Sequence, residues 1–210
     1  MKNLKVVVLI SGKGSNFKAI LNKCNKKNVP AKVVAVISNN PRASGLKING
    51  NFEKIVIDNN LNKKKFESQL HAHLKRLRPN LICLAGFMKI LNPFIIRKWK
   101  NKIINVHPSL LPSFKGLNTH KRVLENGIKI TGCTIHFVDE SLDGGPIIAQ
   151  AATLVKKNMS IEDLSKKVLK IEHQIYPSIV HLFAKKEIGI KNKKVFIKNE
   201  IKRNFFIKNL

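Results

Sequence analysis

Short apolar runs alternate with amphipathic stretches along the first half of the chain, and no other feature constrains the fold as much. The runs have the length and composition of buried strands, and they cover residues 5–10, 31–38, 54–57 and 81–85. Apolar residues between the runs recur at helical spacing, most clearly over 63–77. Strands and helices that alternate in this way build βαβ units around a mostly parallel sheet. We therefore predict an α/β fold.

The second half of the chain departs from this alternation. Two β-rich segments, Thr131–Val138 and Ile147–Leu154, are joined by a polar turn over 139–146, which favours an antiparallel pair and therefore a mixed sheet. The longest helix is predicted over Ser160–Lys185. No linker or internal repeat divides the chain. We predict one Rossmann-like domain, with helices on both faces of the sheet.

Within that domain we expect residues 1–188 to carry the catalytic site. The basic tail, 189–210, alternates Lys and Asn with Val, Phe and Ile. This pattern predicts either edge strands or a loose segment.

The chain is strongly basic, with 40 Lys and Arg against 12 Asp and Glu and a net charge of +28. Such a charge raises the possibility of nucleic-acid binding. Only six of the 40 basic residues are arginines, however, and the lysines are spread along the whole chain. Specific nucleic-acid surfaces usually rely on arginine and on stacking aromatics. We predict no specific nucleic-acid partner and expect the positive field to favour small anionic substrates.

Other classes of protein are disfavoured by what the sequence lacks. Its three cysteines are far apart and show no zinc-ligand spacing, which argues against a disulfide framework or a structural metal. No apolar run approaches the roughly 20 residues that span a membrane, and the short run near the N-terminus leads directly into a glycine loop. We predict a cytoplasmic protein without membrane or metal.

The first strand leads into a loop, Ser11–Asn16, that contains Gly12 and Gly14 and precedes a helix. This arrangement points free backbone N–H groups and the positive end of a helix dipole at a phosphate. Lys13 is followed by glycine rather than Ser or Thr, so the loop is not a Walker A loop. It also lacks the third glycine of a dinucleotide fingerprint. We predict that Gly14, Ser15 and Asn16 bind a phosphomonoester; the alternative is a tight turn with a Ser or Asn helix cap.

A second candidate site lies in the stretch Asn105-Val106-His107-Pro108-Ser109-Leu110-Leu111-Pro112. The two prolines end the preceding strand, and the two-residue spacing places Asn105 and His107 on the same face. Asp143 lies 36 residues beyond His107 at the end of another β segment. A carboxylate beside the imidazole favours its protonated form and keeps a proton donor available, while Asn105 can donate to an oxygen that gains negative charge.

This set of groups suits attack by an external amine on an acyl carbon without a covalent enzyme intermediate. Ser109 and Cys133 stay open as nucleophiles on sequence grounds. His107, His136 and Asp143 also have the composition of a two-histidine, one-carboxylate metal site, although the prolines and Asn105 add nothing to metal binding.

The same residues carry a resemblance to a known family. The Asn105–Pro112 stretch, with Leu142-Asp143-Gly144-Gly145-Pro146, resembles the signature of the formyltetrahydrofolate-dependent formyltransferases. Three further motifs narrow the resemblance to the branch that formylates phosphoribosylglycinamide (GAR) in purine synthesis. They are Ile10-Ser11-Gly12-Lys13-Gly14-Ser15-Asn16, Ala85-Gly86-Phe87-Met88 and Glu172-His173-Gln174-Ile175-Tyr176-Pro177. The resemblance covers residues 5–185.

The resemblance implies transfer of the formyl group of 10-formyltetrahydrofolate to the amine of GAR, with no metal. It implies that His107 is the general acid, Asn105 the donor to the formyl oxygen, and Asp143 the group that keeps His107 charged. GAR would contact Gly14, Ser15, Asn16, Leu169, Lys170, Ile171 and Glu172. The folate would contact Lys63, Met88, Lys89, Ile90, Leu91, Asn105, Asp139, Glu140, Ser141, Leu142 and Asp143.

The chain departs from the family at Lys89, where an arginine is common, so we expect the backbone of that segment to matter more than this side chain. A methionyl-tRNA formyltransferase and a folate deformylase are the neighbouring alternatives. The first usually has an added C-terminal domain and the second an added N-terminal domain, and 210 residues leave room for neither. We expect small-molecule partners only, and a monomer or weak homodimer.

Overall fold

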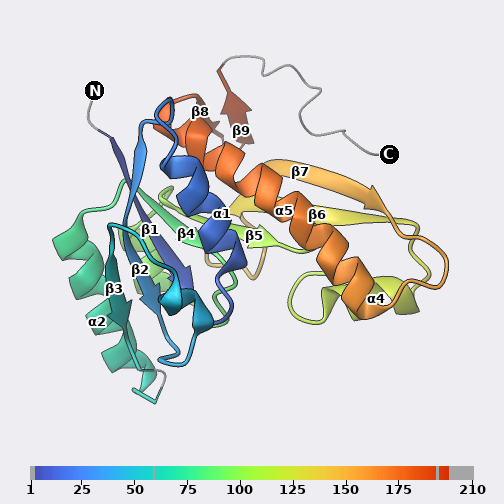
Figure 1. Cartoon of the computed structure of the whole chain (residues 1–210), viewed down its shortest axis with the longest axis horizontal. Coiled ribbons are helices and arrows are strands. Elements are labelled where there is room, and N and C mark those ends of the chain that lie inside the picture. Colours follow the sequence, from blue (N-terminus) through green and yellow to red (C-terminus); the bar gives the residue numbers. More distant parts are fainter. Residues whose placement is uncertain (1–2, 59, 193, 199–210) are drawn as a thin grey trace.

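A seven-stranded mixed sheet with helices on both faces forms the body of the molecule (Figure 1). The structure is a computed structural model that describes residues 3–58, 60–192 and 194–198. The strand order is β3-β2-β1-β4-β5-β6-β7. The strands are β1 (Leu4–Ile10), β2 (Ala31–Ser38), β3 (Glu53–Val56), β4 (Leu81–Leu84), β5 (Ile103–His107), β6 (Ile130–Phe137) and β7 (Ile147–Leu154).

The first five strands are parallel, whereas β6 pairs antiparallel with both β5 and β7. The α/β class, the mixed sheet and the single domain are therefore confirmed. In parallel sheets, ligands bind beyond the carboxyl ends of the strands. The loops that follow β1, β4 and β5 leave from those ends.

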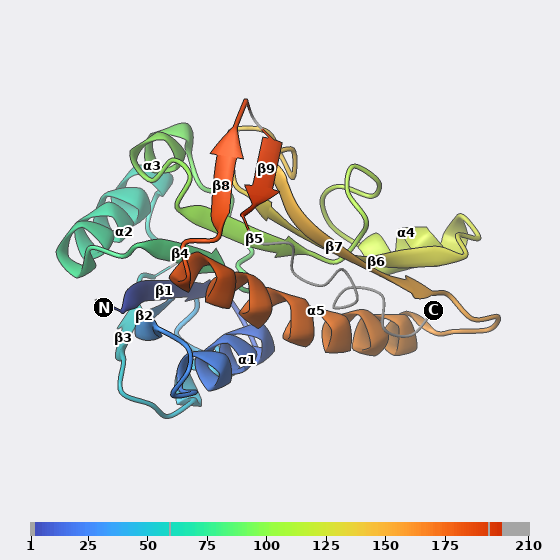
Figure 2. The same cartoon turned by 90° about the horizontal axis from the view of Figure 1, so that it is seen from above.

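The helices are divided between the two faces of the sheet (Figure 2). They are α1 (Ser15–Cys24), α2 (Lys63–Leu77), α3 (Pro93–Lys98), α4 (Thr119–Glu125) and α5 (Ile161–Ala184), with a short 3₁₀ helix, η1 (Ser44–Lys47). Alternation along β1 sends Val6 and Val8 into a core with α1 and α5, while Val7 and Leu9 enter a second core with α2 and α3. The helix α3 was not predicted; it begins with Asn92 as its cap and Pro93 in its first turn.

The helix α5 begins as the sequence predicts, because Ser160 and Asp163 form a capping box. Beyond α5 the chain forms a second, two-stranded antiparallel sheet of β8 (Ile188–Lys191) and β9 (Lys194–Ile197). Its apolar side chains pack against the core on the α1 and α5 side. The tail thus builds a small sheet of its own rather than extending the large one; residues 199–210 lie outside the described residues. No described helix combines the length and apolar character needed to cross a membrane.

Candidate active site

Ser11 joins the loops that follow three neighbouring strands. Its backbone N–H donates to the Gly86 carbonyl at 3.1 Å, and its hydroxyl accepts from the Met88 N–H at 2.8 Å and donates to Asn39 Oδ1 at 2.6 Å. The loops after β1, β2 and β4 are therefore held together by one small side chain. The sequence placed Ser11 in the loop Ser11–Asn16 that is predicted to bind a phosphate (the phosphate loop), but gave no reason to connect it with Asn39.

The loop Ser11–Asn16 turns through a left-handed glycine. Gly14 is the N-cap of α1 at φ 70°, and a Cβ built on it would lie 2.7 Å from the Cα of Gly45. No side chain caps the helix, so the alternative of a Ser or Asn cap is wrong. The first-turn N–H groups of α1 therefore keep their capacity to bind an anion.

Asn16 and Glu172 form a buried pair beside this loop. The Asn16 Nδ2 donates to Glu172 Oε2 at 2.6 Å, and both residues are 6% exposed. Burial raises the pKa of Glu172 to about 7, and the hydrogen bond from Asn16 offsets part of that rise. The Oδ1 of Asn16 is buried and has no hydrogen-bond partner. This orphaned acceptor is suited to receive a hydrogen bond from a ligand.

The other residues that the resemblance assigns to GAR precede Glu172 on α5. Leu169 and Ile171 are half-buried, and Lys170 is exposed to solvent. Of this group only Glu172 makes a hydrogen bond with the phosphate loop. The structure therefore brings Gly14, Ser15, Asn16 and Glu172 together, whereas the side chain of Lys170 points outward.

His107 is 5% exposed at the end of β5 and has an oxygen facing each ring nitrogen. Its Nδ1 lies 3.4 Å from Asp143 Oδ2, and its Nε2 lies 2.9 Å from the Phe114 carbonyl. A carbonyl can only accept a hydrogen bond, so Nε2 carries a hydrogen. The protonated imidazole satisfies both oxygens. The predicted His107–Asp143 pairing is thus present in the structure, while the contact with Phe114 was not predicted.

Asn105 faces His136 across the β5–β6 ladder, with 3.2 Å between Nδ2 and Nε2. The Nδ1 of His136 lies 2.9 Å from the Phe137 carbonyl, so that nitrogen carries the hydrogen. Burial lowers the pKa of His136, which leaves the ring neutral with Nε2 as an acceptor. Asn105 then donates one amide hydrogen to His136 and keeps the second. Because the contact depends on the pairing register of two strands, sequence spacing did not assign His136 this place.

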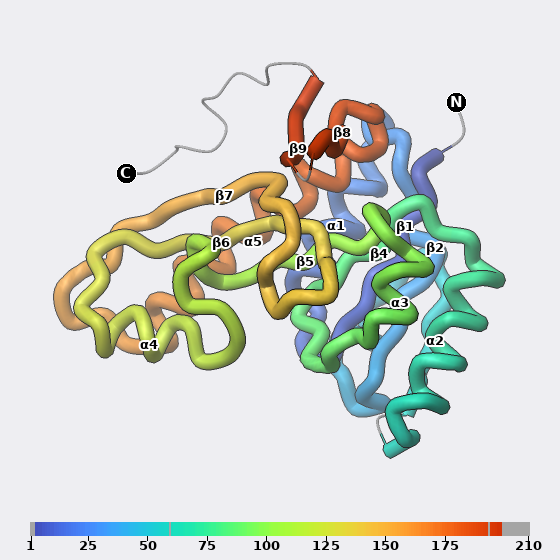
Figure 3. The backbone as a smooth tube through the Cα atoms, turned by 180° about the vertical axis from the view of Figure 1, so that it is seen from behind, coloured from blue at the N-terminus to red at the C-terminus, as the bar shows by residue number. Residues whose placement is uncertain are grey.

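The turn after β6 presents Asp143 in a left-handed conformation, at φ 47°. The Gly116 N–H donates to Asp143 Oδ2 at 2.9 Å, and Asp143 Oδ1 lies 3.8 Å from His136 Nε2. Within the turn, the Ser141 N–H and hydroxyl both donate to Asp139 Oδ1. Figure 3 shows this turn beside α3, where Arg97 and Glu140 form an ion pair at 3.1 Å.

The predicted folate segment presents a mixture of exposed and buried groups. Met88 and Ile90 are 72% and 71% exposed, and Leu142 in the turn after β6 is 58% exposed. Exposed apolar side chains near a polar cluster are a common feature of a ligand site. Leu91 is buried, and the Lys89 ammonium lies 4.2 Å from the centroid of the Phe66 ring. The side chain of Lys89 therefore packs against α2.

Lys63 is the first residue of α2, and in the sequence it lies well before the other residues predicted to contact the folate. It lines a cavity of about 510 Å³ together with Asn92 and Phe94, between α2 and the start of α3. Glu67 closes this cavity on the inside, where its carboxylate accepts hydrogen bonds from the backbone and side chain of Asn92. Asn92, which follows the 88–91 segment in the chain, lines the cavity, whereas residues 88–91 do not.

The two candidate nucleophiles, Ser109 and Cys133, are hydrogen-bonded or buried. The Ser109 hydroxyl donates to the Ser113 carbonyl at 2.6 Å, so its hydrogen is engaged in holding the loop. Cys133 is fully buried, and burial raises the pKa of its thiol well above the usual range. Among the described residues, no group of three or more His, Cys, Asp or Glu side chains is arranged to hold a metal ion.

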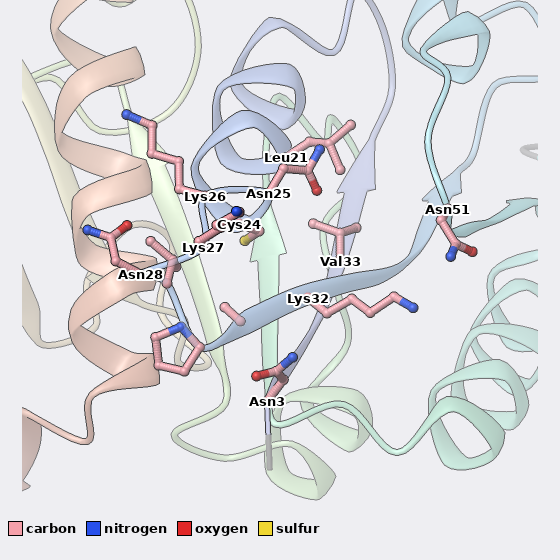
Figure 4. Close-up of a pocket in the computed structure, with 13 residues that line it drawn as sticks. Asn3, Leu21, Cys24, Asn25, Lys26, Lys27, Asn28, Lys32, Val33 and Asn51 are labelled. Atoms are coloured by element: carbon pink, nitrogen blue, oxygen red, sulfur yellow. The ribbon is translucent and has the colours of Figure 1, made fainter. Parts of the chain in front are cut away.

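A cavity of about 700 Å³ lies at the other end of β1 (Figure 4). It is lined by Asn3, by residues that follow α1 such as Lys26, and by Lys32 at the start of β2. These residues lie at the amino ends of the parallel strands, away from Ser11–Asn16. The cavity is therefore not part of the site described above.

The site thus combines a helix N-terminus, a histidine–aspartate pair and an oriented amide at the carboxyl edge of an α/β sheet. A family model described as formyl transferase matches residues 4–180, and the chain belongs to this family.

The relatives of the chain fall into two kinds. A phosphoribosylglycinamide formyltransferase of Haemophilus influenzae is 37% identical over 92% of this chain and 93% of its own length. The trifunctional purine biosynthetic protein adenosine-3 of Gallus gallus is 44% identical over 86% of this chain. The chain spans about a fifth of the length of the first curated relatives it matches. A solved phosphoribosylglycinamide formyltransferase of Anaplasma phagocytophilum superimposes with a TM-score of 0.89 at 40% identity, over 95% of each chain.

Proposed function

We propose that this chain transfers the formyl group of 10-formyltetrahydrofolate to the amine of phosphoribosylglycinamide. The observation that carries the proposal is the His107–Asp143 pair beside an oriented Asn105 amide. The pair lies at the carboxyl ends of the parallel strands, where the phosphate loop also begins. The family and the two formyltransferases of nearly equal length support the choice of substrates.

In this proposal His107 acts as the general acid. The amine nitrogen attacks the formyl carbon and forms the new C–N bond, and the bond from that carbon to N10 of the folate breaks. The Nε2–H of His107 leaves the Phe114 carbonyl and gives its proton to N10, while Nδ1 stays on Asp143. The proton that the amine loses restores the imidazolium, so the ring is unchanged over one turnover. Asp143 keeps the ring charged, and its own orientation is held by the Gly116 N–H.

Asn105 stabilises the negative charge that develops on the formyl oxygen. Its amide is oriented by His136, which accepts one of the two amide hydrogens. The second hydrogen is free for the oxygen of the tetrahedral intermediate. Removing one such donor in an acyl-transfer site typically lowers kcat about 10²- to 10³-fold.

The phosphate loop and Glu172 hold GAR. The first-turn N–H groups at Gly14, Ser15 and Asn16 bind the phosphate, and Glu172 with the free Oδ1 of Asn16 faces the rest of the ribotide. Met88, Ile90 and Leu142 cover the folate ring, with the turn 139–143 along its edge. Lys63 and its cavity take the outer end of the folate.

The proposal is tested by giving the purified chain 10-formyltetrahydrofolate with different acceptors and following tetrahydrofolate release by absorbance. We expect turnover with GAR, and none with water alone or with methionyl-tRNA. Release without any acceptor would indicate a deformylase, and formylation of the tRNA would indicate the other alternative. No turnover with GAR would refute the proposal.

A further inference from the structure

Tyr176, the only tyrosine of the chain, bridges two strands of the sheet through its hydroxyl. The side chain is fully buried on α5. Its hydroxyl donates to the Leu84 carbonyl at 3.1 Å and to the Ile104 carbonyl at 3.0 Å. One hydrogen is thus shared between the carbonyls of β4 and β5.

The bridge sits where these two strands separate. The ladder pairs Cys83 with Ile104 and Leu84 with Asn105, and this is the last pair. Beyond it, β4 turns into the segment that begins at Gly86, while β5 continues to His107. The hydroxyl therefore holds both backbones at the point where the segment from Gly86 onward, proposed to contact the folate, separates from the strand that carries Asn105 and His107.

The same face of α5 also reaches the phosphate loop. Glu172 lies four residues before Tyr176, so the two side chains project from one side of the helix. Glu172 pairs with Asn16, and Tyr176 holds the carbonyl of the residue just before Asn105. A single turn of α5 is thus connected to both proposed substrate sites.

We propose that Tyr176 is a positioning residue that sets the place of the Asn105 amide relative to the phosphate loop. The inference rests on the proposed function. A phenyl ring alone would fill the same core space, so packing does not account for the hydroxyl. The cost of burying an extra polar group is repaid only if its hydrogen bonds are made, and both are made to backbone at the strand ends.

The test is the variant Tyr176→Phe, which keeps the ring and removes the bridge. We expect kcat to fall about tenfold, because small misplacements of a reacting group lower rates strongly. The KM values for GAR and for the folate should stay within twofold, since the binding segments keep their side chains. An unchanged kcat would refute the inference.

Two variants on the same helix separate positioning from stability. Ser178→Ala removes a hydroxyl that donates to the Gln174 carbonyl within α5 at 2.8 Å. Val180→Ala opens a cavity at a fully buried position that does not belong to the site. Both should keep the wild-type kcat, although Val180→Ala should lower Tm at least as much as Tyr176→Phe. If Val180→Ala lowers kcat equally, the role is structural and the inference fails. If the wild type and Ser178→Ala are also inactive, the proposed function fails instead.

A second measurement applies even if Tyr176→Phe does not fold. Growth on 3-fluorotyrosine labels this position alone, because the chain has no other tyrosine. We expect the single ¹⁹F resonance of the folded protein to shift when tetrahydrofolate and formylated GAR bind together, since Asn105 and the bridged carbonyl are adjacent in the chain. A resonance that does not move at saturation would contradict the coupling.

Discussion

At the scale of single residues, the site depends on groups whose charge is set by burial. Glu172 has a raised pKa of about 7 because desolvation disfavours its carboxylate, and only one hydrogen bond, from Asn16, opposes this effect. Burial also lowers the pKa of His136 and keeps its ring neutral. The ring can therefore accept a hydrogen bond from the Asn105 amide and orient it. The sequence predicts the types of these residues but not their burial, which arises from packing between α5, α1 and the sheet.

The raised pKa of Glu172 predicts a pH-dependent gain in stability for Glu172→Gln. Between pH 4.5, the ordinary pKa of a glutamate, and about 7, the folded protein binds a proton that the unfolded chain has released, so this group destabilises the fold increasingly as pH rises. One pKa unit corresponds to about 1.4 kcal/mol, which places the penalty at pH 8 at about 3 kcal/mol. We expect the Tm of Glu172→Gln to exceed that of wild type at pH 8, and the difference to shrink toward pH 5. A difference that does not change with pH would contradict this assignment.

At the scale of elements, the N-terminus of α1 is the part of the site that depends most on backbone geometry. Gly14 is left-handed and lies against Gly45, whereas Gly12 has open space around it and no positive φ. The strand–loop–helix pattern predicts the loop, but the close approach of η1 cannot be read from local sequence. It follows from the packing of residues 44–47 over the turn.

These two glycines form a matched pair for mutation. Gly14→Ala should raise the KM for GAR at least tenfold, because a Cβ there forces the loop away from Gly45 and misaligns the N–H groups. The KM for 10-formyltetrahydrofolate should change less than twofold. Gly12→Ala should leave both KM values near wild type in steady-state assays. Equal effects of the two variants would show that the loop geometry is not what binds the phosphate.

At the scale of the whole molecule, the charge of +28 is the property least explained by the site. We expect DNA and RNA to bind without sequence preference, with an affinity that falls steeply as salt rises, because the lysines act through counterion release. Fluorescence anisotropy between 50 and 300 mM salt measures this slope. Selective binding of one nucleic acid that persists at 300 mM salt would contradict the prediction and revive the nucleic-acid alternative.

The sequence predicts those parts of the molecule that depend on local patterns. β2, α2 and β7 are found where their apolar spacing placed them, because a buried strand and an amphipathic helix have different periods. The helix α3 and the β8–β9 sheet carry too few residues for a clear period.

In the site, the His107–Asp143 pairing was predicted from strand ends, whereas the contacts of His107 with Phe114 and of Asn105 with His136 were not. Both of the missed contacts depend on long-range geometry, namely a folded-back loop and the register of an antiparallel ladder. The roles of all these residues stay predictions.

The most direct test of the account is the rate of formyl transfer to GAR by Asp143→Asn. Asparagine keeps the shape of the side chain and an oxygen for the Gly116 N–H, but removes the negative charge beside the His107 ring. We expect kcat to fall about 100-fold, with the same loss in His107→Ala and little further loss in the double variant. Glu125→Gln is the matched control, because Glu125 is an exposed carboxylate outside the proposed site that pairs with Lys121 on α4; it should keep nearly full activity. Wild-type kcat in Asp143→Asn, or additive losses in the double variant, would contradict the proposed mechanism.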